Sequence, residues 1–326
     1  MLSSEEGRVA VKPRQFHARR VPALATLTVI ACALAACGPA SSPPTGGASA
    51  ARAAGFPVTV SAGGVTTRIP ARPGAIMSLS PTGTEMLYAI GAGRQITAVD
   101  SDSDYPPQAP HTKLSGLQPN LEAIAARKPD LVVASYNPAR LARQLARFGI
   151  PVLALPAPAS LPAVYQQFTE LGRATGHPAQ AATEVAAVRG QLARITASVP
   201  PHRPPVSYYY ELDQTYYSVT SGTFVGRLLG MLGMRSIADK ASGAAAAGGY
   251  PQLSPEYILR ANPGYIILAD TVCCHQDAAT VAKRPGWSSL AAVRDRHVIG
   301  LNDDIASRWG PRIVDLLRAV ATAMKQ

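Results

Sequence analysis

Residues 120–135, "NLEAIAARKPDLVVAS", decide the fold together with a second stretch of the same pattern, residues 254–269, "SPEYILRANPGYIILA". In each stretch a helix-capping residue is followed by a glutamate, an isoleucine and a proline at the same spacing, and then by an apolar run. The cap and the proline delimit a short helix, and the apolar run is typical of a buried strand. The constant offset of 134 residues predicts two lobes of similar build.

Short apolar runs alternate with amphipathic segments on both sides of these stretches. This β-α-β rhythm predicts an α/β fold whose two similar lobes contain parallel sheets covered by helices. A long alanine-rich segment, residues 178–197, is predicted to be the rigid helix that joins the lobes. The predicted organisation is a signal peptide over 1–36, a lipidated N-terminus and flexible tether over 37–68, an N-terminal lobe over 69–158, a connecting helical segment over 159–203 and a C-terminal lobe over 204–326.

The first residues have the pattern of an export signal. A basic head precedes the uncharged run "VPALATLTVIACALAA", residues 21–36, which is short for a transmembrane helix. The run closes on "LAAC" followed by Gly38, which resembles the bacterial lipobox, so Cys37 is the predicted lipidation site. A simple signal peptide or a retained anchor helix is the alternative. We therefore expect an extracytoplasmic protein held to the cell membrane by a lipid on Cys37.

Composition and motifs argue against several functional classes. The formal net charge of +11 is scattered along the chain without a recognition module, so nucleic acid is not an expected partner. The chain has no GxSxG, HExxH or Walker A motif, and its six histidines lack metal-ligand spacing. The acidic stretch 100–105 lacks the glycine and distal glutamate of an EF-hand loop, so no residue is assigned to a metal. We expect a binding protein and not an enzyme, with its ligand between the lobes.

Several blocks in order then carry a family resemblance, from about Ile69 to the C-terminus. "RPGAIMSLSPTGTEMLYAIGAG", "SDSDYPPQAP", "LSGLQPNLEAIAARKPDLVVAS", "YPQLSPEYILRANPGYIIL" and "SRWGPRIVDLL" resemble the metal-chelate substrate-binding proteins of ABC importers. The resemblance implies two lobes bridged by one rigid helix, with little hinge closure. It implies no intrinsic cofactor, and a bound ferric siderophore, haem or cobalamin. The implied partners are this small-molecule chelate and an ABC permease dimer, and the binding protein is expected to be a monomer.

The two repeat glutamates gain a role from this resemblance. In the family, a glutamate on each lobe docks onto arginines of the permease, and the matching positions are Glu122 and Glu256. A two-fold partner needs two equivalent contacts, which agrees with their place in the repeat. The alternative is that an acid in the first turn only favours the helix dipole.

The ligand site is less specified. The predicted ligand-binding residues are Tyr216, Tyr217, Tyr250, Arg308, Trp309, Cys273 and Cys274. Packing in the core is the alternative for the tyrosines, and Arg308 and Arg312 are candidates to pair with an anionic chelate. Cobalamin binders of the family place aromatics at positions matching Asp102, Gly116 and Ser135, none of which is aromatic, and this ranks cobalamin behind an iron chelate.

The adjacent Cys273 and Cys274 in "DTVCCHQD" are a separate question. They are the thiols that remain in an exported protein once Cys32 is removed and Cys37 is lipidated. They can form a vicinal disulfide, stay free or hold a soft metal. We predict the disulfide, on the C-terminal lobe's side of the ligand site, with a loop staple remote from the ligand as the alternative.

The preferred function is therefore capture of an iron chelate, siderophore or haem, and its delivery to an ABC permease. A cobalamin- or corrinoid-binding protein of the same importer class is the first alternative. A surface lipoprotein or sensor that shares the fold but serves no permease is the alternative of another class.

Overall fold

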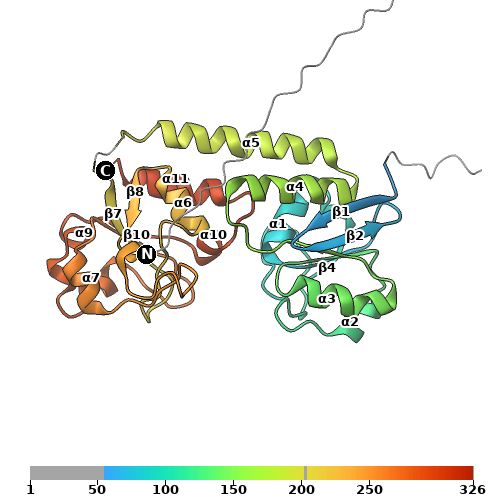
Figure 1. The fold of residues 1–326 in the computed structure, drawn as a ribbon, viewed down its shortest axis with the longest axis horizontal. Coiled ribbons are helices and arrows are strands. Elements are labelled where there is room, and N and C mark those ends of the chain that lie inside the picture. The colour runs from blue at the N-terminus through green and yellow to red at the C-terminus, as the bar shows by residue number, and fades with distance from the viewer. Residues whose placement is uncertain (1–54, 202–203, 326) are drawn as a thin grey trace, which may run out of the picture. The chain divides into compact units, whose positions relative to one another are not determined.

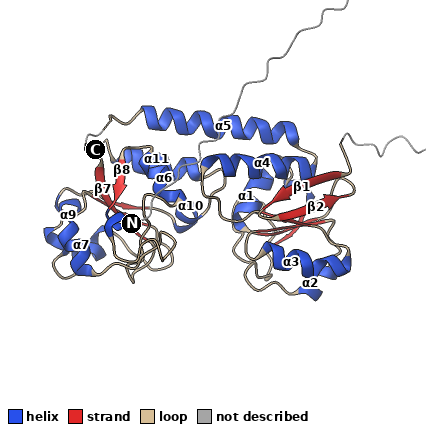
Figure 2. Ribbon diagram, in the orientation of Figure 1, coloured by secondary structure: helices blue, strands red, loops and turns tan. Residues whose placement is uncertain are grey.

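The computed structural model describes residues 55–201 and 204–325. Two four-stranded sheets, parallel throughout, form the centres of two lobes, and helices surround each sheet (Figures 1 and 2). The predicted α/β class with two similar lobes is confirmed. The signal peptide and Cys37 lie outside the described residues. Within 55–201 and 204–325, no helix combines the length and the apolar character that a bilayer span needs.

The N-terminal lobe has the strand order β4-β3-β5-β6. Its strands are β3 (Ile76–Leu79), β4 (Ile96–Val99), β5 (Leu131–Ala134) and β6 (Val152–Ala154), and its helices are α1 (Pro81–Ala89), η1 (Gly93–Gln95), α2 (Leu121–Ala125), α3 (Pro138–Leu145), η2 (Ala146–Phe148) and α4 (Leu161–Thr175). Every residue of β3, β5 and β6 is buried, because helices cover both faces of a parallel sheet. The apolar runs of the sequence are therefore continuous and do not alternate.

The C-terminal lobe repeats this plan with the order β10-β9-β7-β8. Its strands are β7 (Val206–Glu211), β8 (Met234–Ser236), β9 (Tyr265–Leu268) and β10 (Val298–Gly300), and its helices are α6 (Phe224–Gly230), η3 (Ile237–Lys240), α7 (Pro255–Ala261), α8 (Ala278–Ala282), η4 (Trp287–Ser289), α9 (Ala291–Arg294), α10 (Asp303–Ser307) and α11 (Ile313–Ala323). Tyr208, Tyr209 and Tyr210 on β7 are all fully buried. They belong to the core on the two faces of the sheet.

The N-terminal lobe begins earlier than the sequence analysis predicted. The flexible tether was expected to continue through residue 68, but β1 (Val58–Ala62) and β2 (Val65–Ile69) form an antiparallel hairpin. Gly63 and Gly64 make its two-residue turn with φ of 57° and 73°, which other residues rarely adopt. Val60 and Ile69 are buried in the core of this lobe, so the hairpin is part of the folded body.

The connecting segment consists of two helices with different partners. α4 buries Val164, Phe168 and Leu171 in the core of the N-terminal lobe. α5 (Pro178–Ala197) has the predicted bounds and lies beside α4 at one end and α11 at the other (Figure 1). Its buried residues are shared between the lobes, with Ala181 in the N-terminal core and Val188 and Leu192 in the C-terminal core.

Candidate ligand-binding site

The exposed apolar side chains gather on one kind of loop. In the part of the chain that the structure describes, seven large hydrophobic residues are exposed. Five of them lie in loops that follow the carboxyl ends of strands, and a sixth, Tyr250, lies in the loop that follows β8 and η3. These six, here called the rim, are Tyr105, Leu117, Tyr136, Tyr217, Tyr250 and Val272, with exposed fractions from 42% to 61%. The carboxyl ends of parallel strands meet at one edge of a sheet, which is where open α/β folds bind ligands. Each lobe therefore presents an apolar rim at its ligand-binding edge.

A buried ion-pair network connects the two lobes beside the rim. Arg308, between α10 and α11, donates from Nη1 to Glu85 Oε1 on α1 and to Asp104 Oδ1, each at 2.9 Å. Its Nη2 donates to the Asp102 carbonyl at 2.9 Å and to Asp304 Oδ1 at 2.5 Å. The Glu85 side chain is 0% exposed and the Arg308 side chain 8%. These contacts hold the loop after β4 against the segment after β10.

Arg312 completes this network, which we call the junction network (Glu85, Asp104, Asp304, Arg308 and Arg312). Its Nε and Nη2 donate to the two Glu85 oxygens at 3.0 and 2.5 Å. Burial acts to lower the pKa of Arg312, but its bonds to Glu85 outweigh this effect and raise the pKa above its ordinary value. The guanidinium carbon lies 4.3 Å from the centre of the Tyr105 ring. Arg312 thus fixes one aromatic of the rim by a cation–π contact.

Asp104 and Asp304 are the partly exposed carboxyl groups of the network, and their pKa values are shifted in opposite directions. Burial opposes ionisation of Asp104, yet its hydrogen bond to Arg308 holds the pKa below its ordinary value. Burial raises the pKa of Asp304, although the charge of Arg308 opposes the shift. The network contains three carboxyl groups and two guanidinium groups.

Trp309 also lies between the lobes. Its Nε1 donates to Gln167 Oε1 on α4 at 3.0 Å, and its ring packs against the cores of both lobes. Gln167 in turn donates to the Pro156 carbonyl at 2.6 Å. Trp309 is half-buried, so most of its surface serves the contact between lobes.

A second charged cluster supports the C-terminal lobe's part of the rim. Glu211, at the end of β7, accepts from Arg284 Nη1 and Nη2 at 2.6 and 2.5 Å and is 0% exposed. The Arg284 guanidinium lies over the rings of Tyr216 and Trp287, at 5.6 and 4.6 Å from their centres. Tyr216 is therefore held below the surface in a left-handed conformation with φ of 69°, and its neighbour Tyr217 is the exposed member of the pair.

Asp270 lies at the end of the adjacent strand, β9. Its residue is fully buried, and neither carboxylate oxygen has a hydrogen-bond partner among the described residues. Burial, followed by the charge of Glu211, raises the pKa of Asp270 to about 7. A large part of the Asp270 population is therefore protonated at neutral pH, when its neighbour Glu211 is paired with Arg284.

The Cys273–Cys274 loop continues from Asp270. The structure joins the two sulfurs in a vicinal disulfide. One carboxylate, Asp303 at the start of α10, accepts the backbone N–H of Val272 at 2.9 Å and of Cys273 at 2.8 Å. Cys273 is exposed and directly follows the rim residue Val272. Asp303 precedes Asp304, so the anchor of this loop adjoins the junction network.

The two repeat glutamates are exposed and equivalent, as their register predicts. Glu122 lies in the first turn of α2 and Glu256 in the first turn of α7. The helices are capped by Asn120, which accepts from the Ala123 N–H, and by Ser254, which accepts from the Tyr257 N–H. Neither glutamate side chain has an ion-pair partner within the described residues, which leaves both available to another molecule.

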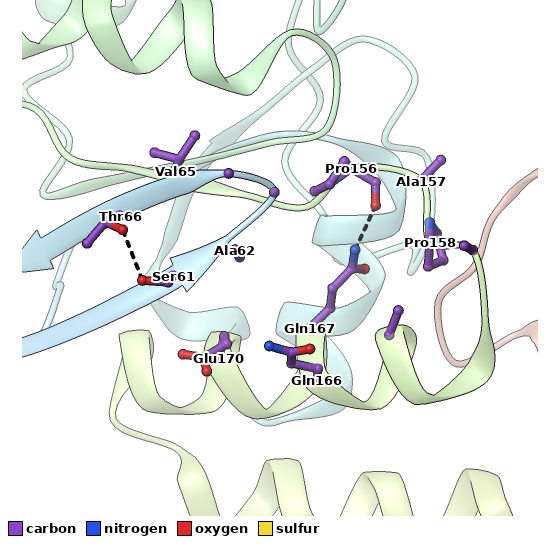
Figure 3. A pocket seen from close by; sticks show the side chains of 14 residues that line it. Ser61, Ala62, Val65, Thr66, Pro156, Ala157, Pro158, Gln166, Gln167 and Glu170 are labelled. Carbon is purple, nitrogen blue, oxygen red and sulfur yellow. Dashed lines mark hydrogen bonds between the residues drawn. The ribbon is translucent and has the colours of Figure 1, made fainter. Parts of the chain in front are cut away.

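One hollow of the N-terminal lobe lies away from the rim. It has a volume of about 420 Å³ and lies between the hairpin turn, the residues after β6 and α4 (Figure 3). Its lining, which includes Ser61, Val65, Pro156 and Gln166, contains no aromatic side chain, and its only charged residue is Glu170. This cavity contains no member of the rim or of the junction network, and we do not assign the ligand to it.

Sequence reasoning found only part of this site. Four of the predicted residues lie in loops at the predicted edge: Tyr217, Tyr250, Cys273 and Cys274. Tyr216 is half-buried in the C-terminal lobe, and Trp309 lies between the lobes. The N-terminal half of the rim, Tyr105, Leu117 and Tyr136, was missed. Its signal was available, because each residue belongs to a loop that directly follows a predicted strand.

Comparison with known proteins identifies the family. The sequence profile of the periplasmic binding protein family matches residues 76–305. The chain belongs to the periplasmic binding protein family. An ABC transporter substrate-binding lipoprotein of Bacillus subtilis, YvrC, is 29% identical over 279 residues, which are 82% of this chain and 86% of the relative. A vitamin B12-binding protein of Pectobacterium atrosepticum is 32% identical over 253 residues, 74% of this chain and 85% of the relative.

Solved structures of periplasmic binding proteins agree with this membership. The vitamin B12-binding protein BtuF of Vibrio cholerae matches with a TM-score of 0.65 at 26% identity, over 78% of this chain and 97% of its own. A possible iron-binding protein of Staphylococcus epidermidis matches with a TM-score of 0.67 at 25% identity, over 78% and 100%. The family resemblance read from the sequence is thus confirmed, and the family is one of substrate-binding proteins.

Proposed function

We propose that this periplasmic binding protein captures a metal chelate, either an iron chelate or a corrinoid, between its two rims and delivers it to an ABC permease. The observation that carries the proposal is the distribution of exposed apolar side chains among the described residues: five of the seven follow the carboxyl ends of strands directly, and Tyr250 follows β8 and η3. Such a surface suits a large ligand with an apolar or aromatic periphery. The names of the relatives, which include vitamin B12-binding proteins and a substrate-binding lipoprotein, support the same class of ligand.

The rim also supports a corrinoid as a candidate ligand. The sequence analysis ranked cobalamin lower because Asp102, Gly116 and Ser135 are not aromatic. A Cβ at Gly116 would lie 2.9 Å from the Leu79 carbonyl oxygen, so this position cannot carry a ring without moving the backbone. The rim places Tyr105, Leu117 and Tyr136 on the same two loops, which supplies the apolar surface at neighbouring positions. We therefore treat an iron chelate and a corrinoid as equal candidates.

Titration calorimetry with matched variants tests the site. Tyr250→Ala, which removes a rim side chain that is 45% exposed, is expected to weaken binding of the preferred chelate about ten-fold. Phe148→Ala is the control, because Phe148 is 43% exposed but lies on η2, outside the rim. The probes are cyanocobalamin, haemin and an uncharged ferric trihydroxamate. Equal effects of the two substitutions on every probe that binds would reject the rim as the ligand site.

Docking to the permease is the second part of the proposal. Glu122 and Glu256 are exposed and equivalent, and neither forms an ion pair with another described residue, which is the arrangement that a two-fold partner with basic sockets requires. Rim charges of this kind set orientation and association rate more than affinity. The double variant Glu122→Lys/Glu256→Lys should retain chelate binding and lose stimulation of the reconstituted transporter's ATP hydrolysis.

A control separates docking from general charge effects. Asp295→Lys reverses an exposed acid at the end of α9, away from both glutamates in the sequence, and should leave the transporter's response unchanged. If the double glutamate variant supports uptake as well as the unaltered protein, the importer role fails. A surface lipoprotein or sensor that serves no permease would then be the better description.

The vicinal disulfide is proposed to stiffen the ligand-facing loop. Its anchoring by Asp303 and its position next to Val272 support this role. Mass spectrometry of the native protein should find both thiols blocked, and alkylation without prior reduction would contradict the disulfide. Cys273→Ser/Cys274→Ser should weaken chelate binding; unchanged affinity would make the bridge a staple of the loop alone.

The cellular placement follows from the N-terminal sequence and stays part of the proposal. We place the protein outside the cytoplasm as a monomer, anchored to the cell membrane through a lipid on Cys37. Metabolic labelling with a fatty acid should mark the protein, and Cys37→Ala should abolish the label and release the protein from the membrane. Labelling that persists in Cys37→Ala would contradict this anchor.

A further inference from the structure

The two arginines of the junction network already have carboxylate partners within the protein. Both terminal nitrogens of Arg308 donate to oxygens of Glu85, Asp104, Asp102 and Asp304. Arg312 uses Nε and Nη2 on Glu85 and presents its face to Tyr105. An anionic ligand would have to displace a carboxylate to reach Arg308, and at Arg312 it would meet a guanidinium whose charge is already paired with Glu85. Displacement from Glu85 would leave a fully buried charge without a partner, which is unfavourable.

The surrounding loops add negative charge. The loops that follow the strands of the two four-stranded sheets, one of them separated from β8 by η3, span residues 100–120, 135–137, 155–160, 212–223, 241–254, 269–277 and 301–302. Their acidic residues are Asp100, Asp102, Asp104, Asp213, Asp270 and Asp277. Lys113 is the one lysine or arginine in these loops. Even with Asp270 protonated, acids outnumber basic groups in these loops, so the loops themselves do not attract anions.

We propose that the site selects metal chelates without net negative charge, and that Arg308 and Arg312 position the rim instead of binding the ligand. This inference rests on the proposed function and narrows its ligand class. It favours a neutral corrinoid or a neutral or cationic ferric hydroxamate over haem and over anionic ferric catecholates. In this arrangement Arg312 acts through Tyr105, whose ring it holds in place at the rim.

Two pairs of probes, in each of which one member carries an added carboxylate, test the proposal by titration calorimetry. One pair is cyanocobalamin and its monocarboxylic acid derivative; the other is the ferric chelate of desferrioxamine B, which is cationic, and its N-succinyl derivative, which is anionic. In the pair that binds, the form with the added carboxylate should bind about 5- to 10-fold more weakly, and added salt should reduce the difference. Equal or tighter binding of the carboxylate form overturns the charge selection and leaves the proposed function standing. No binding by any of the four probes or by haemin overturns the proposed function and this inference with it.

Removing a network carboxylate provides a second readout. Asp104→Asn deletes one negative charge at a side chain that is 58% exposed, so the fold should tolerate it. The carboxylate form of the probe should gain affinity relative to its parent by about 3- to 5-fold, because Arg308 then has one anionic partner fewer. An unchanged ratio would show that the network does not set the charge preference.

Arg140→Gln removes an exposed arginine that lines a hollow with Tyr136 and Leu117. Loss of anion binding in this variant would place an anion site outside the network and overturn the proposal.

Discussion

Glu85 joins parts of the chain that are far apart in sequence. It lies 223 residues from Arg308 and 227 from Arg312, and it binds both with a carboxylate that is fully buried. Breaking a buried pair by removing one partner is strongly unfavourable, because the remaining charge stays out of water. Exposed pairs contribute far less, because water and salt screen them.

Arg308→Met should therefore lower the free energy of unfolding by about 2–4 kcal/mol. Arg318→Met breaks an ion pair with Asp315, whose side chains are 50% and 45% exposed, and should cost less than about 1 kcal/mol. Urea denaturation followed by far-ultraviolet circular dichroism measures both. Equal costs would show that the junction network contributes no more than a surface pair.

Asp270 makes stability depend on pH in a direction opposite to that of most carboxylates. Its folded pKa of about 7 lies above the ordinary value of 3.8, because of burial first and Glu211 second. Between these values the folded state binds more protons than the unfolded state, so this residue's contribution to stability falls as pH rises from about 4 to about 7. The other groups near it, Arg284 and Tyr209, do not change charge in this range.

Asp270→Asn should remove that contribution. The free energy of unfolding of the variant relative to the parent should rise by about 1–3 kcal/mol between about pH 4 and about pH 8 and stay level above. Parallel stability curves for the two proteins would contradict the raised pKa. The measured quantity is the difference between the stability curves of the two proteins against pH. The contributions of Asp100 and the other acids, which both proteins share, cancel in this difference.

Single residues of the site could be predicted from the sequence only where a local rule applied. Glu122 and Glu256 follow from the repeat, and the exposed Tyr217 follows from its place after a strand. The partners of Arg308 could not be predicted, because Glu85 and Asp104 approach it only when two lobes pack together. The same is true of Tyr105, whose position at the rim depends on Arg312.

At the scale of elements, the two connecting helices cross at a small residue. A Cβ on Gly172 of α4 would lie 2.5 Å from Ala181 Cβ of α5 and 3.0 Å from the His177 carbonyl oxygen. Gly190 of α5 differs, since the nearest atom to an added Cβ is the flexible tip of Arg194 at 3.4 Å. Both glycines lie in helices, but a side chain at Gly172 would collide with the neighbouring helix, whereas a side chain at Gly190 would have room.

Gly190→Ala should stabilise the protein by about 0.5–1 kcal/mol, the difference in helix propensity. Gly172→Ala should destabilise it by about 1–3 kcal/mol, because the helices must move apart. Thermal unfolding of both variants measures the effect. A loss of stability in Gly190→Ala, or a gain in Gly172→Ala, would contradict the described packing of α4 and α5.

Most elements of the two sheets were predictable, since most strands are apolar runs and most helices have a capping residue or a proline at their start. The bounds of α5 agree residue for residue. The hairpin was missed although "VTVSAGGVTTRI" alternates around a Gly-Gly turn, because the composition before it reads as a tether. β8 was missed because it has three residues, Met234 to Ser236, and too little pattern to recognise.

At the scale of the whole folded body, residues 55–201 and 204–325, three features connect the lobes. α5 contributes to both cores, Trp309 packs against both, and the junction network joins them by ion pairs. A hinge that closed on a ligand would have to break buried charge pairs. The lobes should therefore keep their separation when a chelate binds.

Small-angle X-ray scattering tests this expectation. The radius of gyration should change by less than about 1 Å on saturation with the chelate that binds, in contrast to the closure of hinged binding proteins. The Glu85→Gln variant, which weakens the junction, serves as a comparison and should show a larger change. A marked decrease in the unaltered protein would demonstrate hinge closure.

The chain contains two tryptophans, and their positions give the protein an intrinsic optical probe for each region. Trp287 is 1% exposed under Tyr216 and Arg284, whereas Trp309 is half-buried between the lobes. Their fluorescence should therefore separate into a blue-shifted emission from the C-terminal lobe and a redder emission from the junction. In a Trp287→Phe chain the remaining emission would follow the contact between the lobes alone, without any attached dye.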